Sequence, residues 1–326
     1  MEQPADFRLA CPRCRRPFPP APDVLRCPAC ELRFSRDGGV WRLLPPEREL
    51  ALRRFVTEYR AVRRQEGWGS RGPAYYRALP FRDLTGRFEE IWRIRAASFA
   101  TLLRRVVRPM EDQSERPLAV LDVGAGNGWL SHQLSERGHR LAAVDLSDDA
   151  RDGLGAHVHY ATSFTAVLAD FDHRPFADRQ ADLVVFNAAL HYSPDFGATL
   201  AETLRVLREA GHLVIMDSPV YHDAASGTRM VREREQVFIR EHGFPSNAIA
   251  SEGFLTYRRL RELSADLGLR FWLLRPLRWW PMRGRALLAT VQGHREQATF
   301  PVIVGRRPPG ATGGPGSRFG RGHAAR

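Results

Sequence analysis

Residues 118–130 read LAVLDVGAGNGWL and join an apolar run, a glycine-rich loop and the first turn of a helix. The apolar run, residues 118–123, is continuous, which is typical of a strand buried on both faces of a parallel sheet. Gly124, Gly126 and Gly128 let the backbone approach a ligand closely, and the helix after them offers free N–H groups. A strand, a glycine loop and a helix in this order predict one wall of a nucleotide-type pocket.

Four more apolar runs follow at intervals that suit alternating strands and helices. A polar residue stands at or directly after the end of each run, and these residues are Asp145, Asp170, Asn187 and Asp217. Open α/β sheets bind ligands at the carboxyl ends of their strands, so we expect these residues to gather there. Asp145 stands 21 residues after Gly124, and an acid at the end of the second strand can accept hydrogen bonds from both hydroxyls of a ribose.

Two later strands complete the predicted fold. We expect them at residues 270–274 and 300–304. They make a seven-stranded, mostly parallel sheet of the Rossmann-like α/β class, with helices on both faces. Thr256 is expected to cap a helix that ends at Leu267 before the first of them.

All four cysteines lie near the N-terminus in two CxxC pairs, Cys11 with Cys14 and, twelve residues later, Cys27 with Cys30. Two such pairs can hold one Zn²⁺ ion with four thiolates, which leaves no open position for catalysis. Disulfides are disfavoured, because we find no export signal and expect a cytoplasmic chain with reduced thiols. We therefore predict a structural zinc ribbon over residues 1–45, held folded by its metal.

Two helices are predicted between the ribbon and the sheet. One amphipathic helix covers residues 47–66, and a longer one runs from about Gly86 until Pro109 stops it. The intervening Trp68, Tyr75 and Tyr76 either form a lid over a ligand or pack in the core.

The block from about Leu118 to Val220 resembles the class I S-adenosylmethionine-dependent methyltransferases. Four motifs carry the resemblance: LDVGAGNG at 121–128, AVDLS at 143–147, ADFDHRPFAD at 169–178 and ADLVVFNAALH at 181–191. The resemblance implies S-adenosylmethionine as cofactor, and the similar subgroup is a broad, mostly small-molecule group that includes quinone-pathway enzymes. The implied cofactor-binding residues are Asp122, Gly124, Gly126, Asn127, Gly128, Asp145, Leu146, Asp170, Phe171 and Asn187.

The resemblance also implies which part of the cofactor each of these residues contacts. The three glycines cradle the methionine part, with Asp122 and Asn187 close to it. Asp145 takes the ribose with Leu146 against adenine, and Asp170 accepts from the adenine amine with Phe171 alongside. The predicted ribbon is similar to one that precedes the catalytic domain in bacterial 23S rRNA guanine-N1 methyltransferases, where the resemblance implies RNA binding.

Three functions follow from these patterns. The leading hypothesis is methyl transfer to an O, N or C atom of a small molecule. The first alternative is methylation of rRNA or tRNA bases, with the ribbon and the basic flanks on the RNA. The second is a non-catalytic zinc-ribbon binding protein with a vestigial cofactor pocket.

Methyl transfer needs a general base when the acceptor must lose a proton. His191, four residues after Asn187, is the candidate catalytic residue, and a substrate-pocket or structural role is the alternative. Methylation at C5 of pyrimidines is disfavoured, because all four cysteines are assigned to zinc. The motif Asn/Asp-Pro-Pro-Tyr of enzymes that methylate exocyclic adenine nitrogens is replaced here by Asn187-Ala188-Ala189-Leu190.

The chain has a net charge of +12, and all of its 49 basic residues are arginine. Residues 118–220 have a net charge of −7, so the flanking segments together have +19. Either this is compositional scatter, or the flanks face an anionic partner. Arginines and tryptophans alternate at 275–285, a pattern that suits RNA, a membrane surface, an aromatic pocket or an ordinary surface. No apolar run is near the ~18 residues of a membrane span.

The expected domain organisation has four parts. A zinc ribbon occupies residues 1–45, and a helical linker or lid occupies residues 46–117. The methyltransferase-like domain covers residues 118–307. A tail of Gly, Pro and Arg at 308–326 is expected to be disordered, because it cannot bury enough apolar surface.

Overall fold

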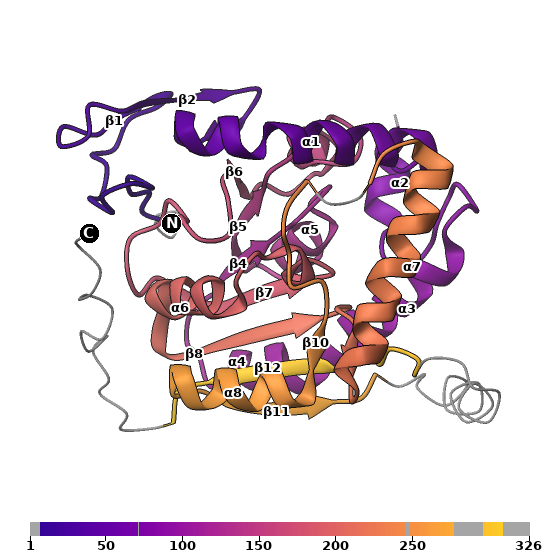
Figure 1. The fold of residues 1–326 in the computed structure, drawn as a ribbon. Coiled ribbons are helices and arrows are strands. Elements are labelled where there is room, and N and C mark those ends of the chain that lie inside the picture. The colour runs from indigo at the N-terminus through magenta and orange to yellow at the C-terminus, as the bar shows by residue number, and fades with distance from the viewer. Residues whose placement is uncertain (1–6, 71, 246–247, 277–295, 309–326) are drawn as a thin grey trace, which may run out of the picture.

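The computed structural model describes residues 7–70, 72–245, 248–276 and 296–308. Ten strands form one sheet in the order β1-β2-β3-β6-β5-β4-β7-β8-β12-β11 (Figure 1). The strands are β1 (Val24–Arg26), β2 (Arg33–Asp37), β3 (Val40–Arg42), β4 (Ala119–Val123), β5 (Arg140–Asp145), β6 (Thr165–Leu168), β7 (Ala181–Asn187), β8 (Leu207–Met216), β11 (Arg270–Leu274) and β12 (Val302–Arg306). Two short strands, β9 (Val220–Tyr221) and β10 (Leu255–Thr256), pair in parallel apart from this sheet.

The predicted seven-stranded sheet is confirmed as the part from β6 to β11. Strands β6, β5, β4, β7 and β8 are parallel, and β12 and β11 close the far edge in antiparallel pairing. Every residue of β4 and β7 is buried, as expected for strands covered on both faces. The strand predicted at 300–304 begins two residues later, at Val302, and the strand that ends before Asp217 begins at Leu207.

Helices cover both faces of the sheet. They are α1 (Pro46–Glu66), α2 (Pro73–Ala78), α3 (Glu89–Leu102), α4 (Arg108–Glu111), α5 (Trp129–Ser135), α6 (Phe196–Val206), α7 (Ala224–His242) and α8 (Tyr257–Leu267). One face packs on α6 and α8 through Leu121, Leu200 and Leu263, among others. The other packs on α3 and α5 through residues such as Val120 and Leu134. The Thr256 side chain accepts from the Arg259 N–H, so the predicted cap of α8 is confirmed.

The prediction that Pro109 stops the second helix is wrong. The helix α3 continues through a π-helical turn at Leu103–Val107 into the four-residue helix α4. Pro109 lies in the first turn of α4, directly after the π-helical turn.

Trp68, Tyr75 and Tyr76 are buried in the core, which confirms packing rather than a lid. Tyr76 donates to the carbonyl oxygen of Ser70 at 2.5 Å and to that of Arg151 at 2.8 Å. These residues therefore support the region beside the sheet.

The ribbon is joined to the sheet. A tight turn at Gly38 and Gly39, both with positive φ, connects β2 and β3 as the sequence indicates. The strand β3 pairs in parallel with β6, so the three ribbon strands extend the seven-stranded sheet to ten. The boundary drawn at residue 45 stays a prediction. Most of the arginine and tryptophan segment at 275–285, and all but the first residue of the predicted disordered tail, lie outside the described residues.

Candidate functional site

A cavity of about 120 Å³ lies at the carboxyl ends of the parallel strands, with α1 as one wall. Figure 1 shows α1 along the top of the molecule and α7 on the right, toward which β7 and β8 point. The cavity residues of α1 recur every three or four positions, so they share one helix face; they are Arg48, Leu52, Phe55, Val56, Tyr59 and Arg63. The apolar stripe of the helix predicted at 47–66 therefore faces a cavity as well as the protein body.

Nine of the ten predicted cofactor residues line this cavity. They are Asp122, Gly124, Gly126, Asn127, Asp145, Leu146, Asp170, Phe171 and Asn187. Gly128 does not line it; an added Cβ there would lie 2.7 Å from the Phe164 ring. The structure thus brings together residues from four different strand ends, as the sequence predicts, while their roles stay predictions.

The glycine loop uses conformations that other residues rarely adopt. Gly124 and Gly126 have φ values of +74° and +54°. A Cβ on Gly124 would lie 2.3 Å from the Cβ of Ala189, whereas a Cβ on Gly126 would meet no atom within 4 Å. The backbone at Gly126 is therefore open toward space that a ligand can occupy.

Asp145 accepts hydrogen bonds from the glycine loop and can still accept more. Its Oδ2 accepts from the Gly126 N–H and its Oδ1 from the Ser147 N–H, both at 2.8 Å. Each oxygen has a further lone pair, so the carboxylate can also accept from ligand hydroxyls. Burial raises the pKa of Asp145 above its ordinary value.

Asp122 is buried at the end of β4 and is only partly satisfied. Its Oδ2 accepts from the Ser131 hydroxyl at 2.9 Å, while its Oδ1 has no hydrogen-bond partner among the described residues. Burial raises the pKa of Asp122 to about 7. A buried carboxylate oxygen without a partner fits a cationic or donating group of a ligand.

Unlike Asp122, Asp170 has a hydrogen-bond partner for each carboxylate oxygen. Its Oδ1 accepts from the His173 N–H at 2.8 Å, and its Oδ2 accepts from Nε of Arg48 at 2.6 Å. Burial raises the pKa of Asp170, but the hydrogen bonds from the side chains of His173 and Arg48 outweigh burial and leave the pKa below its ordinary value. The carboxylate is therefore charged and tied to α1.

Arg95 is a cavity residue that the sequence analysis missed. Its guanidinium lies over the rings of Trp92 and Trp68, 4.7 and 5.6 Å from their centroids. It makes no hydrogen bond or ion pair within the part of the chain that the structure describes. Burial lowers the pKa of Arg95, and the nearby charge of Arg63 adds to that effect. The sequence feature that could have identified Arg95 is its position between Trp92 and Phe99, on the apolar face of a predicted helix.

His191 lies beside the cavity without lining it. Its Nδ1 is 3.3 Å from the Ser218 hydroxyl, and its ring packs against Tyr192, which does line the cavity. Burial lowers the pKa of His191 to about 3, and the charges of Arg234 and Arg95 act in the same direction. An imidazole with this pKa is neutral and weakly basic at pH 7, so these observations favour the structural alternative. Its catalytic role stays a prediction.

Asp217, at the end of β8, joins Asn187 near the cavity. It accepts from the Ser98 hydroxyl at 2.6 Å and from the Asn187 amide at 3.4 Å. Burial raises the pKa of Asp217. Its partners fix the orientation of the Asn187 side chain toward the cavity.

A second cavity of about 380 Å³ lies between α1 and α7. Its walls share five residues with the first, namely Phe55, Tyr59, Arg63, Tyr192 and Ile249. Phe55, Tyr59 and Tyr192 form an aromatic group with ring centroids 5.7–6.2 Å apart. Val237 and Phe238 of α7 belong to the second cavity alone. The two cavities therefore adjoin, and Phe55, Tyr59 and Tyr192 lie at their shared boundary.

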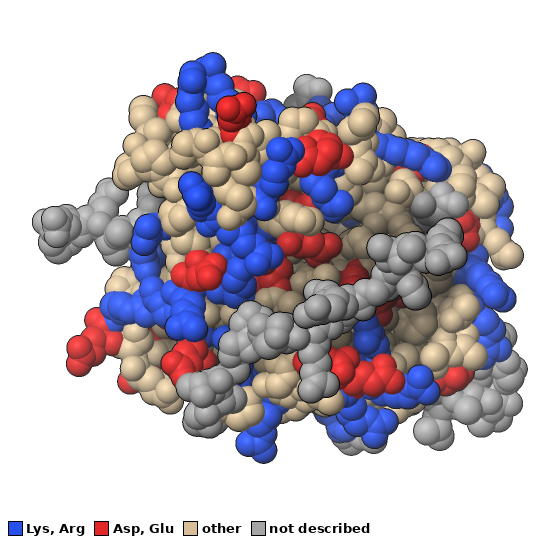
Figure 2. Space-filling view, turned by 60° about the vertical axis from the view of Figure 1, so that its left-hand side comes forward, with Lys and Arg blue, Asp and Glu red and all other residues tan. Residues whose placement is uncertain are grey.

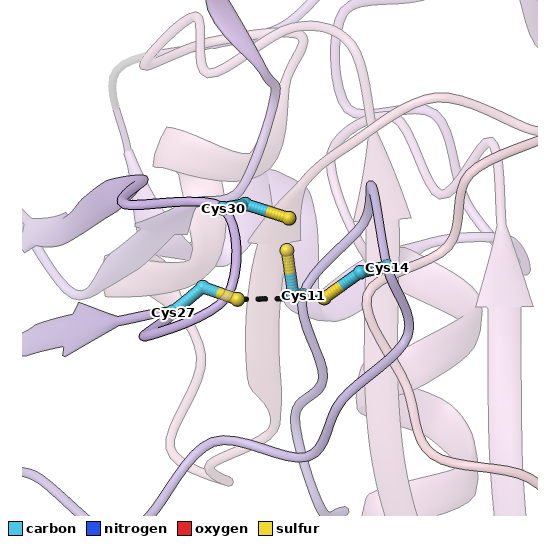
Figure 3. A group of neighbouring side chains, drawn as sticks. All are labelled: Cys11, Cys14, Cys27 and Cys30. Carbon is cyan, nitrogen blue, oxygen red and sulfur yellow. Dashed lines mark hydrogen bonds between the residues drawn. The ribbon is translucent and has the colours of Figure 1, made fainter.

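The four cysteines converge from two loops (Figure 3). Their sulfur atoms all lie within 4.8 Å of one another, and Sγ of Cys14 is 3.4 Å from Sγ of Cys27. Tetrahedral Zn–S bonds of about 2.3 Å place sulfurs roughly 3.8 Å apart, so the donor set fits Zn²⁺. A hydrogen bond with Cys14 raises the pKa of Cys30 to about 12, and the Arg16 N–H lowers that of Cys14 to about 7.

Basic and acidic side chains are interleaved on the face shown in Figure 2. Many arginines of α1 and the ribbon pair with acids of the sheet loops, such as Arg42 with Asp148 and Arg64 with Asp149. Part of the basic charge of the flanks thus serves internal ion pairs. No helix among the described residues is long and apolar enough to cross a membrane.

The parallel sheet, the glycine loop and the acids at the strand ends define a Rossmann-like α/β domain. Residues 121–215 match the family described as "Methyltransferase domain". The match begins after the ribbon, whose similarity to the ribbon of rRNA methyltransferases it does not address.

The chain is similar to curated methyltransferases. Malonyl-[acyl-carrier protein] O-methyltransferase of Hahella chejuensis is 33% identical over 156 residues, covering 47% of this chain and 51% of that protein. Demethylmenaquinone methyltransferase of Thermobifida fusca is 38% identical over 101 residues, covering 30% of this chain and 42% of that protein. These alignments span about half or less of the relatives' lengths.

Among solved structures, phosphoethanolamine N-methyltransferase 2 of Haemonchus contortus, in complex with S-adenosyl-L-methionine, is similar with a TM-score of 0.42 and 14% identity. The alignment covers 60% of this chain and 50% of that chain.

Proposed function

We propose that this protein is an S-adenosylmethionine-dependent methyltransferase that acts on a small, largely apolar acceptor. The observation that carries the proposal is the single cavity that gathers the glycine loop and the acids of β4, β5 and β6 under α1. The match of residues 121–215 to a methyltransferase domain supports it. Zn²⁺, held by Cys11, Cys14, Cys27 and Cys30, would have a structural role.

The cavity residues suit the two ends of the cofactor. Asp145 offers lone pairs to the ribose hydroxyls, and Phe171 and Leu146 provide apolar surface for adenine. At the other end, the unpartnered Oδ1 of Asp122 suits the α-ammonium group of the methionine part. Arg95, a partly buried cation that forms no ion pair with a carboxylate among the described residues, suits the carboxylate group.

The acceptor is expected in the second cavity. Its walls combine the aromatic group of Phe55, Tyr59 and Tyr192 with Val237 and Phe238. Charged residues, among them Glu58, Arg234 and Glu241, complete the lining. Such walls favour an apolar or aromatic molecule over a nucleic acid strand, whose phosphates would need a row of unpaired cations. The names of the relatives, which act on malonyl-acyl-carrier protein and on demethylmenaquinone, fit a small or carrier-linked acceptor.

Bound S-adenosylmethionine supplies a methyl group on a positively charged sulfur, and the transfer is an in-line displacement that leaves a neutral thioether. The contribution of this chain is orientation and exclusion of water, because well-oriented groups can gain effective molarities of about 10⁵ M or more. The helix α1 shields the cavity, and Asn187, which donates to the Asp217 carboxylate at 3.4 Å, lines it.

The decisive experiment has two stages. Calorimetry with S-adenosylhomocysteine should show binding at micromolar concentrations, and its absence would favour the vestigial pocket. Transfer of labelled methyl groups to fractionated cell extract should then label metabolites or carrier-bound acyl groups. Label that enters RNA alone would overturn the proposed acceptor class.

A further inference from the structure

The ribbon holds the start of the loop that carries Asp170 and Phe171. The strand β3 pairs in parallel with β6, the strand that leads into this loop. Just after β3, the Leu43 N–H donates to the Leu168 carbonyl oxygen at 2.9 Å, two residues before Asp170. Leu43 is fully buried, so its backbone position is fixed by packing as well.

The ribbon also holds the end of the same loop. The Ala10 N–H donates to the Pro175 carbonyl oxygen at 2.9 Å, and Leu9 forms an antiparallel bridge with Phe176. The buried rings of Phe7 and Phe176 pack edge to face, with centroids 5.6 Å apart. Cys11 follows Ala10 directly, so the first zinc knuckle begins where the loop contact ends.

A third link runs through the first turn of α1. Arg13, which lies between Cys11 and Cys14, donates through Nη2 to the Glu47 carboxylate at 2.6 Å. The next residue of the helix, Arg48, donates to the Asp170 carboxylate at 2.6 Å. Two neighbouring residues of α1 thus connect the zinc knuckle to the acid expected at adenine.

These three contacts all depend on a small segment. The ribbon strands β1 and β3 have three residues each, and such short strands are marginal without other support. In a segment of this kind, metal binding provides the free energy of folding. Loss of the metal is therefore expected to release residues 169–177 and the start of α1 together.

We propose that the ribbon is a positioning element of the cofactor site, so that zinc occupancy sets the affinity for the adenine end of the cofactor. This inference rests on the proposed function, because it assumes that S-adenosylmethionine binds the cavity. It gives the ribbon a role inside the molecule, in contrast to the RNA contact that its sequence suggests.

The first test compares full-length protein loaded with zinc and stripped by a chelator. Calorimetry should show S-adenosylhomocysteine binding weakened about tenfold or more on stripping and restored when zinc is returned. An unchanged affinity would overturn the inference. If the zinc-loaded protein does not bind at all, the proposed function fails instead, which is a different result.

Hydrogen exchange separates positioning from global unfolding. Without zinc, exchange should rise in residues 168–177 and in the first turns of α1, while β8, β12 and α8 at the far edge stay protected. Faster exchange across the whole sheet would mean that the ribbon merely stabilises the fold, and would contradict a positioning role.

A milder test breaks the third link without touching the cysteines. Arg13→Gln and Glu47→Gln remove an ion pair whose side chains are 45% and 53% exposed, so the fold should tolerate both changes. Each should weaken S-adenosylhomocysteine binding by about two- to fivefold, the range that an exposed pair can supply. Arg54→Gln, which breaks the Arg54–Glu58 pair elsewhere on α1, is the matched control and should have no effect. Equal effects of all three variants would contradict the link.

Discussion

The guanidinium of Arg95 lies 4.7 Å from the centroid of the Trp92 ring and lines the cavity without a carboxylate partner in the described chain. Trp92 packs in turn against Trp129, the first residue of the helix after the glycine loop, with centroids 6.1 Å apart. The cation is therefore placed by aromatic packing, which leaves its N–H groups available to a ligand.

Arg95→Gln should weaken binding of S-adenosylhomocysteine about tenfold or more, because it removes a charge-assisted contact to the ligand carboxylate. Binding of 5′-methylthioadenosine, which lacks the amino-acid part, should not change. Calorimetry with both ligands measures the difference. Arg93→Gln, on the exposed side of the same helix, is the control. Equal weakening for the two ligands would indicate that Arg95 only supports the fold.

Gly126→Ala should abolish most cofactor binding, because the new methyl group enters space that no protein atom occupies within 4 Å. The positive φ should also cost about 1–2 kcal/mol of unfolding free energy. Gly138→Ala shares the positive φ and the open space but lies outside the cavity, so it should lose stability alone. Urea unfolding and calorimetry check the pair, and intact binding in Gly126→Ala would refute the role of the loop.

Asp122 should make the ligand-free protein less stable as pH rises. Its folded pKa of about 7 lies above the ordinary value of 3.8, so the folded state binds the extra proton between these values. The stability that this proton provides is complete below about pH 4 and is lost as pH rises through 7. Asp122→Asn should remove this pH dependence, which amounts to about 3 kcal/mol between pH 5 and pH 8. Urea unfolding at pH 5 and pH 8 measures the unfolding free energy of both proteins. An equal change in that free energy between the two pH values, in the variant and in the unchanged protein, would rule out the effect of Asp122.

Val237→Arg should raise the KM for the acceptor and leave the affinity for S-adenosylhomocysteine unchanged, because Val237 lines the second cavity alone. Ile239→Arg, an exposed position on the same helix that lines neither cavity, should change neither quantity. Methyl transfer to the labelled extract fraction gives the readout. A loss of cofactor affinity in Val237→Arg would show that the two cavities are not separate sites.

The central sheet and the cofactor cavity could be predicted because their signals are local. Continuous apolar runs define β4 and β7, and the glycine loop and strand-end acids follow them in sequence. The wall formed by α1 could not be predicted, because the contact of Arg48 with Asp170 joins residues 122 positions apart. The prediction that the helix ends at Pro109 failed, because a π-helical turn can lead into a further helical turn that contains the proline.

The pairing of the ribbon with the sheet also could not be predicted from the sequence. The strand β3 has only three residues, and no pattern in them marks β6 as its partner. The apolar residues of β6, Ala166 to Leu168, are buried in the complete sheet. Without residues 1–45 they would form an open edge with unpaired N–H and C=O groups, which is a template for intermolecular pairing. The ribbon covers this edge, so a domain cut free of residues 1–45 is expected to self-associate through β6.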